Sequence, residues 1–285
     1  MKGLWQRWTR RGNTPDSPAP WEVRAVVRTD IGKRRSHNED AAAFVRPGTA
    51  SVRTEKGCLA IVADGMGGHL AGEVASQMAL ETLREVYFQQ NTSPEQALKT
   101  AFTEANRRIW QAAQEQTDQR GMGTTCTVAL VRGTSLYMGH IGDSRLYHIG
   151  INGILRQLTR DDTLVQALVT EGVLTPDEAL THPDRNLLTH ALGMEPDLSP
   201  HVEQWAEPLQ TGDRLLLCSD GLYDLLDPAE LTTELLNPSI HEAADRLLNL
   251  ALDRGGHDNV TLLILEINPS AVLSADTATP SYDAQ

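Results

Sequence analysis

The sequence is poor in cysteine and in long apolar runs, and each shortage excludes a class of protein. Its three cysteines, Cys58, Cys126 and Cys218, stand inside apolar segments, in a number and spacing typical of neither a disulfide framework nor a zinc site. We expect them to be reduced core residues of a cytoplasmic protein. No apolar segment approaches the roughly 20 residues of a membrane span, and the N-terminus has no apolar signal core. We therefore expect a soluble protein without a transmembrane segment.

Basic residues are also in the minority. Lysine and arginine number 25 against 38 acidic residues, which gives a formal net charge of −13. Phosphate backbones attract basic surfaces, so nucleic acid is not expected as the main partner. We expect bound metal to offset part of the negative charge. With 285 residues, 40% of them hydrophobic, the chain is long enough to bury a sizeable core.

The two ends of the chain differ in composition from its middle. Residues 1–20 combine Trp5 and Trp8 with four basic residues and end in the proline-rich segment TPDSPAP. This pattern predicts a disordered tail and linker, with weak contact to a membrane surface or partner as the alternative. Residues 269–285 are small and polar and are also expected to be disordered. No linker or repeat interrupts residues 21–268, which predicts one domain there.

Hydrophobic periodicity divides this domain into strands and helices. Alternating or apolar β-branched runs predict strands over 23–29, 41–45, 58–63, 126–132, 135–141, 145–149, 154–159, 202–206, 214–219 and 260–267. Three-to-four spacing predicts helices over 71–88, 94–116, 228–236 and 240–253, with Ser93 as the N-cap of the second. Hairpin-length connections favour antiparallel sheets. We therefore predict an α+β fold, a β-sandwich covered by helix pairs on both faces.

Residues 160–197 do not fit the series of strands. They combine short helical patterns with glycine and proline turns, in a segment too structured to be disordered. We interpret them as a mobile flap beside a functional site, and the alternative is a purely structural insertion.

Five short acidic motifs carry the chemistry: R-S-H-N-E-D ending at Asp40, D-G-M-G-G-H from Asp64, G-D-S-R from Gly142, S-D-G-L from Ser219 and H-D-N-V-T from His257. Asp64 and Asp220 directly follow apolar strands, and Asp258 directly precedes one. Each aspartate alone is commonly a turn residue or a helix cap. Three carboxylates at the tips of core strands can converge, and oxygen ligands suit Mg²⁺ and Mn²⁺. Convergence therefore predicts a site for hard cations.

In order and spacing, these motifs resemble those of the metal-dependent Ser/Thr protein phosphatases, the PPM or type 2C family, and most closely its bacterial kinase-opposing branch. The resemblance covers about residues 23 to 267. Each motif alone is weak, but the joint match is specific. The family fold is a four-layer αββα sandwich, two central antiparallel sheets flanked by helix pairs, which agrees with the pattern above.

The resemblance implies a ligand set for two core ions, Mn²⁺ or Mg²⁺. Asp64 would bridge both ions, and the carbonyl of Gly65 would bind one of them. The other implied ligands are Asp220 and Asp258, Asp40, Glu39 through a coordinated water, Asp143 at a third and weaker site, and, as a guess, Thr181 from the flap.

The resemblance also implies the reaction. A water or hydroxide bridging the two ions attacks the phosphorus directly, so no protein nucleophile is needed. Arg35 matches the phosphate-binding arginine of the family, because its planar fork can hold two phosphate oxygens. The adjacent Arg34 is the alternative for this role.

One position departs from many eukaryotic relatives, which carry a histidine where this chain has Met66. In those relatives the histidine is thought to protonate the leaving alkoxide. Here the proton would come from a metal-bound water or from His69, whose alternative role is structural, at the start of the next helix.

The function expected from these features is hydrolysis of phosphoserine and phosphothreonine in proteins, including a Ser/Thr kinase and its substrates. We expect a monomer. A pseudophosphatase that uses the fold only for binding is one alternative, but it would have lost ligands that this chain retains. A phosphatase dedicated to one regulatory phosphoprotein is another.

Overall fold

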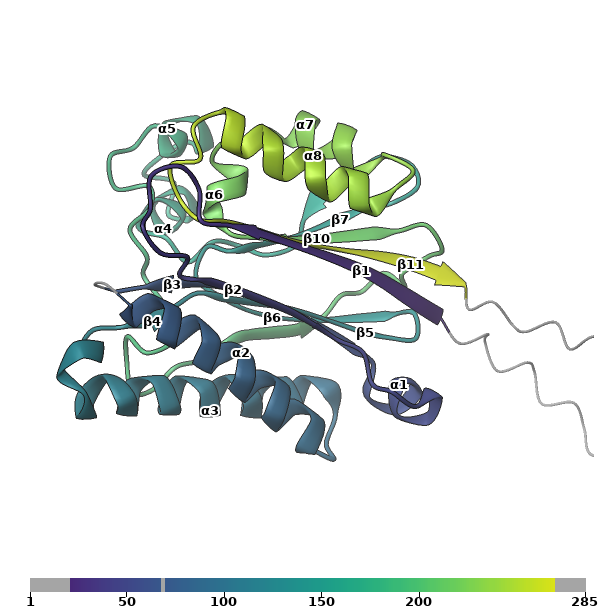
Figure 1. Cartoon of the computed structure of the whole chain (residues 1–285), viewed down its shortest axis with the longest axis horizontal. Helices are drawn as coiled ribbons and strands as arrows, with labels where there is room; N and C mark the ends of the chain where they lie inside the picture. Colours follow the sequence, from purple (N-terminus) through teal and green to yellow (C-terminus); the bar gives the residue numbers. More distant parts are fainter. Residues whose placement is uncertain (1–20, 68–69, 270–285) are drawn as a thin grey trace, which may run out of the picture.

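The computed structural model describes residues 21–67 and 70–269 as a stack of four layers (Figure 1). The predictions of disorder for the two tails lie outside these described residues. The strands are β1 (Trp21–Asp30), β2 (Asp40–Val45), β3 (Cys58–Met66), β4 (Gly123–Thr124), β5 (Cys126–Arg132), β6 (Ser135–Ile141), β7 (Arg145–Ile149), β8 (Leu155–Gln157), β9 (His201–Gln204), β10 (Arg214–Cys218) and β11 (Val260–Pro269). The helices are α1 (Ala50–Lys56), α2 (Ala71–Gln89), α3 (Pro94–Glu115), α4 (Leu164–Thr170), α5 (Pro176–Leu180), α6 (Asp220–Tyr223), α7 (Pro228–Leu235) and α8 (Ile240–Asp253), with a 3-10 turn at Thr117–Gln119.

The strands form two antiparallel sheets that face each other. Sheet A has the order β1-β11-β10-β7-β8, and sheet B has the order β2-β3-β5-β6-β9, with β4 paired to β3. Helices α7 and α8 cover the outer face of sheet A, and α2 and α3 cover the outer face of sheet B (Figure 1). The predicted α+β sandwich with helices on both faces is confirmed.

Each central strand supplies side chains to two separate cores. In β3, Leu59 and Ile61 point toward α2 and α3, whereas Ala60 and Val62 point toward sheet A, and all four are fully buried. Alternation of this kind follows from the two-residue period of a strand. Because β3 is buried on both sides, nearly every position along it is apolar. Each large apolar side chain removed from water contributes roughly 1.5–3 kcal/mol to folding stability.

Most predicted elements are confirmed within one or two residues. Ser93 caps α3 as expected, because its side chain accepts a hydrogen bond from the backbone N–H of Gln96 at 3.3 Å. The strand expected over 154–159 is shorter, since only Leu155–Gln157 pairs with β7. Two short helices, α1 and α6, were not predicted. The α6 turn begins at Asp220, within a motif that we interpreted only as a strand tip.

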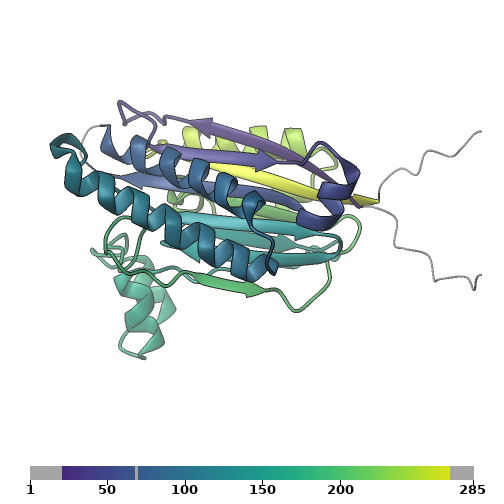
Figure 2. The ribbon, with the colours of Figure 1, turned by 90° about the horizontal axis from the view of Figure 1, so that it is seen from below.

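The predicted flap segment, residues 160–197, contains α4 and α5 and connects β8 to β9. Figure 2 shows that these helices project beyond the sandwich, clear of α2 and α3. In Figure 1 they lie at the end of the molecule where β3 ends and α6 begins. The acidic motifs occupy this same end.

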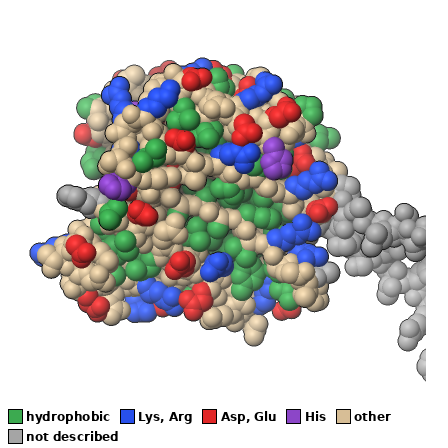
Figure 3. All heavy atoms as spheres, in the orientation of Figure 1, with side chains coloured by type: hydrophobic (Ala, Val, Ile, Leu, Met, Phe, Trp, Pro, Cys, Tyr) green, Lys and Arg blue, Asp and Glu red, His purple; other side chains and the backbone are tan. Residues whose placement is uncertain are grey.

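Surface and helix composition agree with the bulk sequence. On the face drawn in Figure 3, acidic and basic side chains are interspersed, without a broad basic area. Within the part of the chain that the structure describes, no helix is both long and apolar enough to cross a membrane. The three cysteines are free and buried, as predicted.

Candidate metal centre

Sheet B places two acidic residues opposite each other. Asp40 is the first residue of β2, Asp64 lies near the end of β3, and the antiparallel register pairs the two directly. The side chains of directly opposed residues in an antiparallel pair lie on the same face of the sheet. Pairing carboxylates here is unfavourable without a cation between them.

The backbone of Asp64 is fixed on both sides, which leaves its carboxylate free. Its N–H donates to Thr125 Oγ1 at 3.0 Å, and its carbonyl accepts from the Thr125 N–H and the Thr124 hydroxyl, both at 2.9 Å. The next residue, Gly65, lies against α2 so closely that a Cβ atom would come within 2.1 Å of the Gly72 carbonyl oxygen. Only glycine fits this approach, so the G of the D-G motif has a packing reason here.

Sheet A supplies the opposing carboxylates. Asp220 follows β10 as the first residue of α6, and Asp258 precedes β11, whose start pairs with the end of β10. The two sheets are joined at this point, because the Ser219 hydroxyl donates to Asp40 Oδ2 at 2.8 Å. The tips of β2, β3, β10 and β11 therefore meet at one end of the sandwich.

A fifth carboxylate lies on the turn that crosses from sheet B to sheet A. Asp143 stands between β6 and β7 and is only 6% exposed. The preceding Gly142 has a φ of +98°, a conformation that glycine adopts readily. Burial raises the pKa of Asp220, with the charge of Asp143 as the next cause, and the charge of Asp143 also adds to the raised pKa of Asp64. The candidate third site is therefore close to the core cluster.

Burial and mutual repulsion dominate the electrostatics of the cluster. Burial raises the pKa of Asp64 well above its usual range, with the charges of Asp40 and Asp220 adding to the effect. Burial likewise raises the pKa of Asp40 to about 6 and that of Asp143 to about 7. The pKa of Glu39 is also raised, chiefly by burial. Such a cluster is costly in the charged form unless a cation accompanies it.

The donor set fits a hard divalent ion. Two buried oxygens, Asp40 Oδ1 and Asp220 Oδ1, have no hydrogen-bond partner, as expected of oxygens reserved for a metal. Across residues 21–67 and 70–269, however, no three acidic, histidine or cysteine side chains are close enough together to enclose an ion. Closing the set around an ion therefore requires the side chains to rotate.

Arg35 reaches the cluster and Arg34 does not. The Arg35 guanidinium donates to Asp258 Oδ2 at 2.7 Å, and its own side chain is 48% exposed. Arg34 is exposed on the same loop. This contact puts Arg35 beside the carboxylate cluster, and the phosphate-binding role stays a prediction for it, with Arg34 as the alternative.

Two residues at the candidate site were not predicted from the sequence. The buried Asn259 accepts from the Glu39 N–H at 2.8 Å and donates to the carbonyls of Ile31 and His37, both at 2.9 Å, so it fixes the loop that carries Arg35. Asp224 lies one helical turn after Asp220, and its buried Oδ2 atom accepts no hydrogen bond but lies 3.6 Å from a guanidinium nitrogen of Arg185 on the flap. The four-residue spacing from Asp220 to Asp224 was the available signal, since it places both on one helix face.

Some predicted residues remain untested by the geometry. The Thr181 hydroxyl donates weakly to the Glu178 carbonyl at 3.5 Å on an exposed part of the flap, and its role as a metal ligand stays a prediction. His69 lies outside the described residues. His257 is exposed beside Asp258.

Known proteins resemble this chain over most of its length. A family model described as protein phosphatase 2C matches residues 32–254. The serine/threonine phosphatase stp of Listeria innocua is 37% identical over 252 residues, which is 86% of this chain and 96% of that protein. PstP of Mycobacterium tuberculosis is 40% identical over 249 residues, or 86% of this chain and 45% of that longer protein. The crystal structure of the PstP catalytic domain in complex with two manganese ions matches with a TM-score of 0.74 and 37% identity, covering 87% of this chain and 99% of that one.

Fold, acidic cluster and these matches together define a metal-dependent enzyme built on an α+β sandwich. The chain belongs to the protein phosphatase 2C family, as its motifs predicted. It is a protein phosphatase, and the relatives that match it are bacterial.

The raised pKa values predict an unusual pH dependence of stability. A carboxyl group whose pKa is higher in the folded state binds more protons when folded, so it stabilises the fold below its unfolded pKa and loses this effect as the pH rises. The loss runs from the ordinary aspartate pKa of 3.8 up to the folded pKa, about 6 for Asp40 and about 7 for Asp143, and is complete above it. In chelator, the melting temperature should therefore fall as the pH is raised from about 5 to about 8. Added Mn²⁺ should reverse this trend, because it competes with protons for the same oxygens. A metal-free melting temperature that rises over this range would contradict the assignment.

Proposed function

We propose that this protein hydrolyses phosphoserine and phosphothreonine residues of other proteins by direct attack of water, using two divalent ions, Mn²⁺ or Mg²⁺. The single observation that carries the proposal is the meeting of carboxylates from both sheets, with unpartnered buried oxygens, at one end of the sandwich. The manganese-bound relative and the serine/threonine phosphatases that match the chain support it. When bound, the ion pair supplies an activated water and neutralises charge on the phosphoryl group.

In this proposal, the acidic residues of the chain would hold the ions, and Arg35 would hold the phosphate. Asp64, with the Gly65 carbonyl, would lie between the ions, and Asp40, Asp220 and Asp258 would complete the set. Glu39 would hold a coordinated water, and Asp143 would contribute to a third and weaker site. The tip positions keep these side chains at one end of the sandwich without a flexible segment, so once they have turned toward bound ions little further reorganisation is needed during the reaction.

Arg35 is the residue of this chain that meets the substrate phosphate. Its guanidinium already donates to a carboxylate at the site, and a phosphate offers the same planar pairing with two oxygens. We propose that Arg35 exchanges Asp258 for the phosphate when the site is loaded. The flap, residues 160–197, lies at the same end of the molecule as the cluster and would contact the polypeptide around the phosphorylated residue.

The proposed targets are phosphoproteins in the cytoplasm, including a Ser/Thr kinase and its substrates, with the enzyme acting as a monomer. The most direct test is phosphate release from matched peptides that carry phosphothreonine, phosphoserine or phosphotyrosine. We expect Mn²⁺-dependent release from the first two, abolished by chelator and restored by Mn²⁺, and little release from the third. Release that survives chelation would reject the metal-dependent reaction, and equal activity on phosphotyrosine would reject the specificity.

A further inference from the structure

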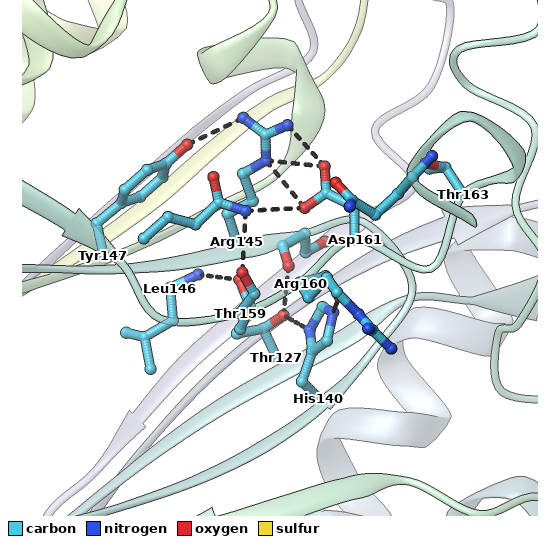
Figure 4. A network of polar contacts seen from close by, with 12 residues as sticks. Thr127, His140, Arg145, Leu146, Tyr147, Thr159, Arg160, Asp161 and Thr163 are labelled. Atoms are coloured by element: carbon cyan, nitrogen blue, oxygen red, sulfur yellow. Dashed lines mark hydrogen bonds and ion pairs between the residues drawn. The ribbon is translucent and has the colours of Figure 1, made fainter. Parts of the chain in front are cut away.

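A chain of buried polar contacts runs from the metal centre to the start of the flap, and Figure 4 shows its part from Thr127 and His140 to Arg160. Thr125, which binds the Asp64 N–H, is hydrogen-bonded to the Ser144 hydroxyl. The Thr127 hydroxyl donates to the Ser144 carbonyl at 2.7 Å and also contacts His140 Nδ1 at 2.9 Å. The other ring nitrogen, His140 Nε2, lies 3.1 Å from the Arg160 carbonyl oxygen.

The flap root, Arg160 to Asp162, is held at three successive residues. His140 contacts the carbonyl of the first, and Arg145 binds the carboxylate of Asp161 with a shortest distance of 2.6 Å. Asp162 exchanges two hydrogen bonds with Gly142, at 2.7 and 3.0 Å. All three partners stand on or beside the turn that carries Asp143. The position of the flap is therefore set by the same turn as the candidate third metal site.

Of these three contacts with the flap root, the one made by His140 depends on the protonation state of the ring. When the ring is neutral, the set of hydrogen bonds around it is one hydrogen short. The contacts from His140 to Arg160 O, from His140 to Thr127 Oγ1 and from Thr127 to Ser144 O need one hydrogen each. Both carbonyl oxygens can only accept. A neutral imidazole brings one hydrogen and the threonine hydroxyl brings another, which makes two hydrogens for three contacts. An imidazolium ring brings two and completes the set.

The two neutral tautomers therefore satisfy different parts of the chain. With hydrogen on Nε2, the ring donates to the Arg160 carbonyl, and the Thr127 hydroxyl must turn to Nδ1 and release Ser144. With hydrogen on Nδ1, Thr127 keeps Ser144, and a bare Nε2 faces the Arg160 carbonyl. We propose that His140 is a positioning residue that couples the flap root to the turn that carries Asp143. The neutral ring allows the hydrogen bond to only one of the two at a time, to the Arg160 carbonyl or, through Thr127, to the Ser144 carbonyl. The protonated ring allows both.

The surroundings of His140 act on its protonation in both directions. The side chain is only 3% exposed, and burial lowers its pKa, so the neutral ring prevails at neutral pH. Asp161 and Asp162 from the flap root oppose this effect, and His201, the cross-strand neighbour on β9, adds to it. Arg145 neutralises Asp161 in part through its ion pair. A cavity of about 290 Å³ lined by His140, Arg160 and His201 gives solvent protons a route to the ring.

Hydrogen exchange of the flap root tests the proton count. In the full-length Mn²⁺-loaded protein, the protection of residues 160–164, corrected for intrinsic rates, should rise as the pH is lowered from about 7.5 and the His140 ring takes up its second proton. His140→Gln should lose this pH dependence, since a glutamine does not titrate. His201→Gln removes an imidazole that lies 3.4 Å from Asp162 Oδ1 and measures the share of that contact, and the control His241→Gln, at an exposed histidine on α8, should keep the full pH dependence. An unchanged pH dependence in His140→Gln, or its loss in the control alone, would overturn the proposal.

Kinetics separate a positioning role from a merely structural one, on the premise that the proposed phosphatase function holds. His140→Gln and Thr127→Val should lower kcat/KM for a phosphothreonine peptide by roughly 3- to 10-fold, the effect of one hydrogen bond, mainly through KM. The loss should be clearly smaller for p-nitrophenyl phosphate, which offers no polypeptide to the flap. Equal losses on both substrates, or none on the peptide, would overturn the inference. If the wild-type protein itself releases no phosphate, the proposed function fails, while hydrogen exchange still decides the role of His140.

Discussion

Replacing Asp64 by asparagine is expected to lower kcat/KM for a phosphothreonine peptide by about three orders of magnitude, several kcal/mol of lost transition-state stabilisation. The amide keeps the shape of the side chain and its backbone contacts but removes the charge that would bridge two ions. The same substitution should stabilise the metal-free protein, because Asp64 is repelled by Asp40 and Asp220. A gain of about 1 kcal/mol would raise the melting temperature by about 2–4 °C.

The opposite signs of these two effects make the prediction specific. Activity is measured by phosphate release in Mn²⁺, and stability by thermal unfolding in chelator. Asp177→Asn is the matched control, because Asp177 is an exposed carboxylate on the flap and should change neither quantity. A variant that is both inactive and less stable without metal would indicate a structural role for Asp64 and count against the metal centre.

Removing the Arg35 guanidinium is expected to produce the second large effect. Arg35→Ala should lower kcat/KM by roughly 100-fold or more, because a charge-assisted, two-point contact to the phosphate is lost. Arg35→Lys should recover only part of this loss, since an ammonium group retains the charge but not the planar fork. Affinity for Mn²⁺ should rise in Arg35→Ala, because Asp258 no longer shares its Oδ2 atom with the arginine.

The neighbouring residue provides the control. Arg34→Ala changes the net charge of the loop by the same amount, and it should leave both peptide turnover and Mn²⁺ affinity close to wild type. Steady-state kinetics and calorimetric titration with Mn²⁺ give the two readouts. If Arg34→Ala shows the large kinetic loss and Arg35→Ala does not, the phosphate-binding role belongs to Arg34.

Local sequence signals were sufficient to predict most of the strands and helices of this protein. Apolar runs such as that of β3 identified the strands, because burial on both faces makes every position apolar. Ser93 identified the start of α3 through its capping chemistry. The Asp64 and Asp258 positions could be predicted because each directly adjoins a strand, and the tips of adjacent strands meet. Each of these signals lies within a few residues of the feature that it predicts.

Contacts between distant segments were not predictable in the same way. Asn259 fixes a loop more than 200 residues earlier in the chain, and nothing in its own sequence neighbourhood indicates that partner. The link from His140 to the flap root also depends on how β5, β6 and the flap pack, and no local pattern encodes it. Helix α6 was missed because a single turn has too few residues to show a helical period.

Anomalous diffraction from manganese-soaked crystals tests the central claim most directly. The account predicts two strong manganese peaks at the end of the sandwich, both in contact with the Asp64 carboxylate, with Asp220 and Asp258 turned toward them. Crystals of Asp64→Asn grown in the same way should lose this pair of peaks. Wild-type crystals in which the carboxylates stay apart and no manganese binds among them would contradict the account.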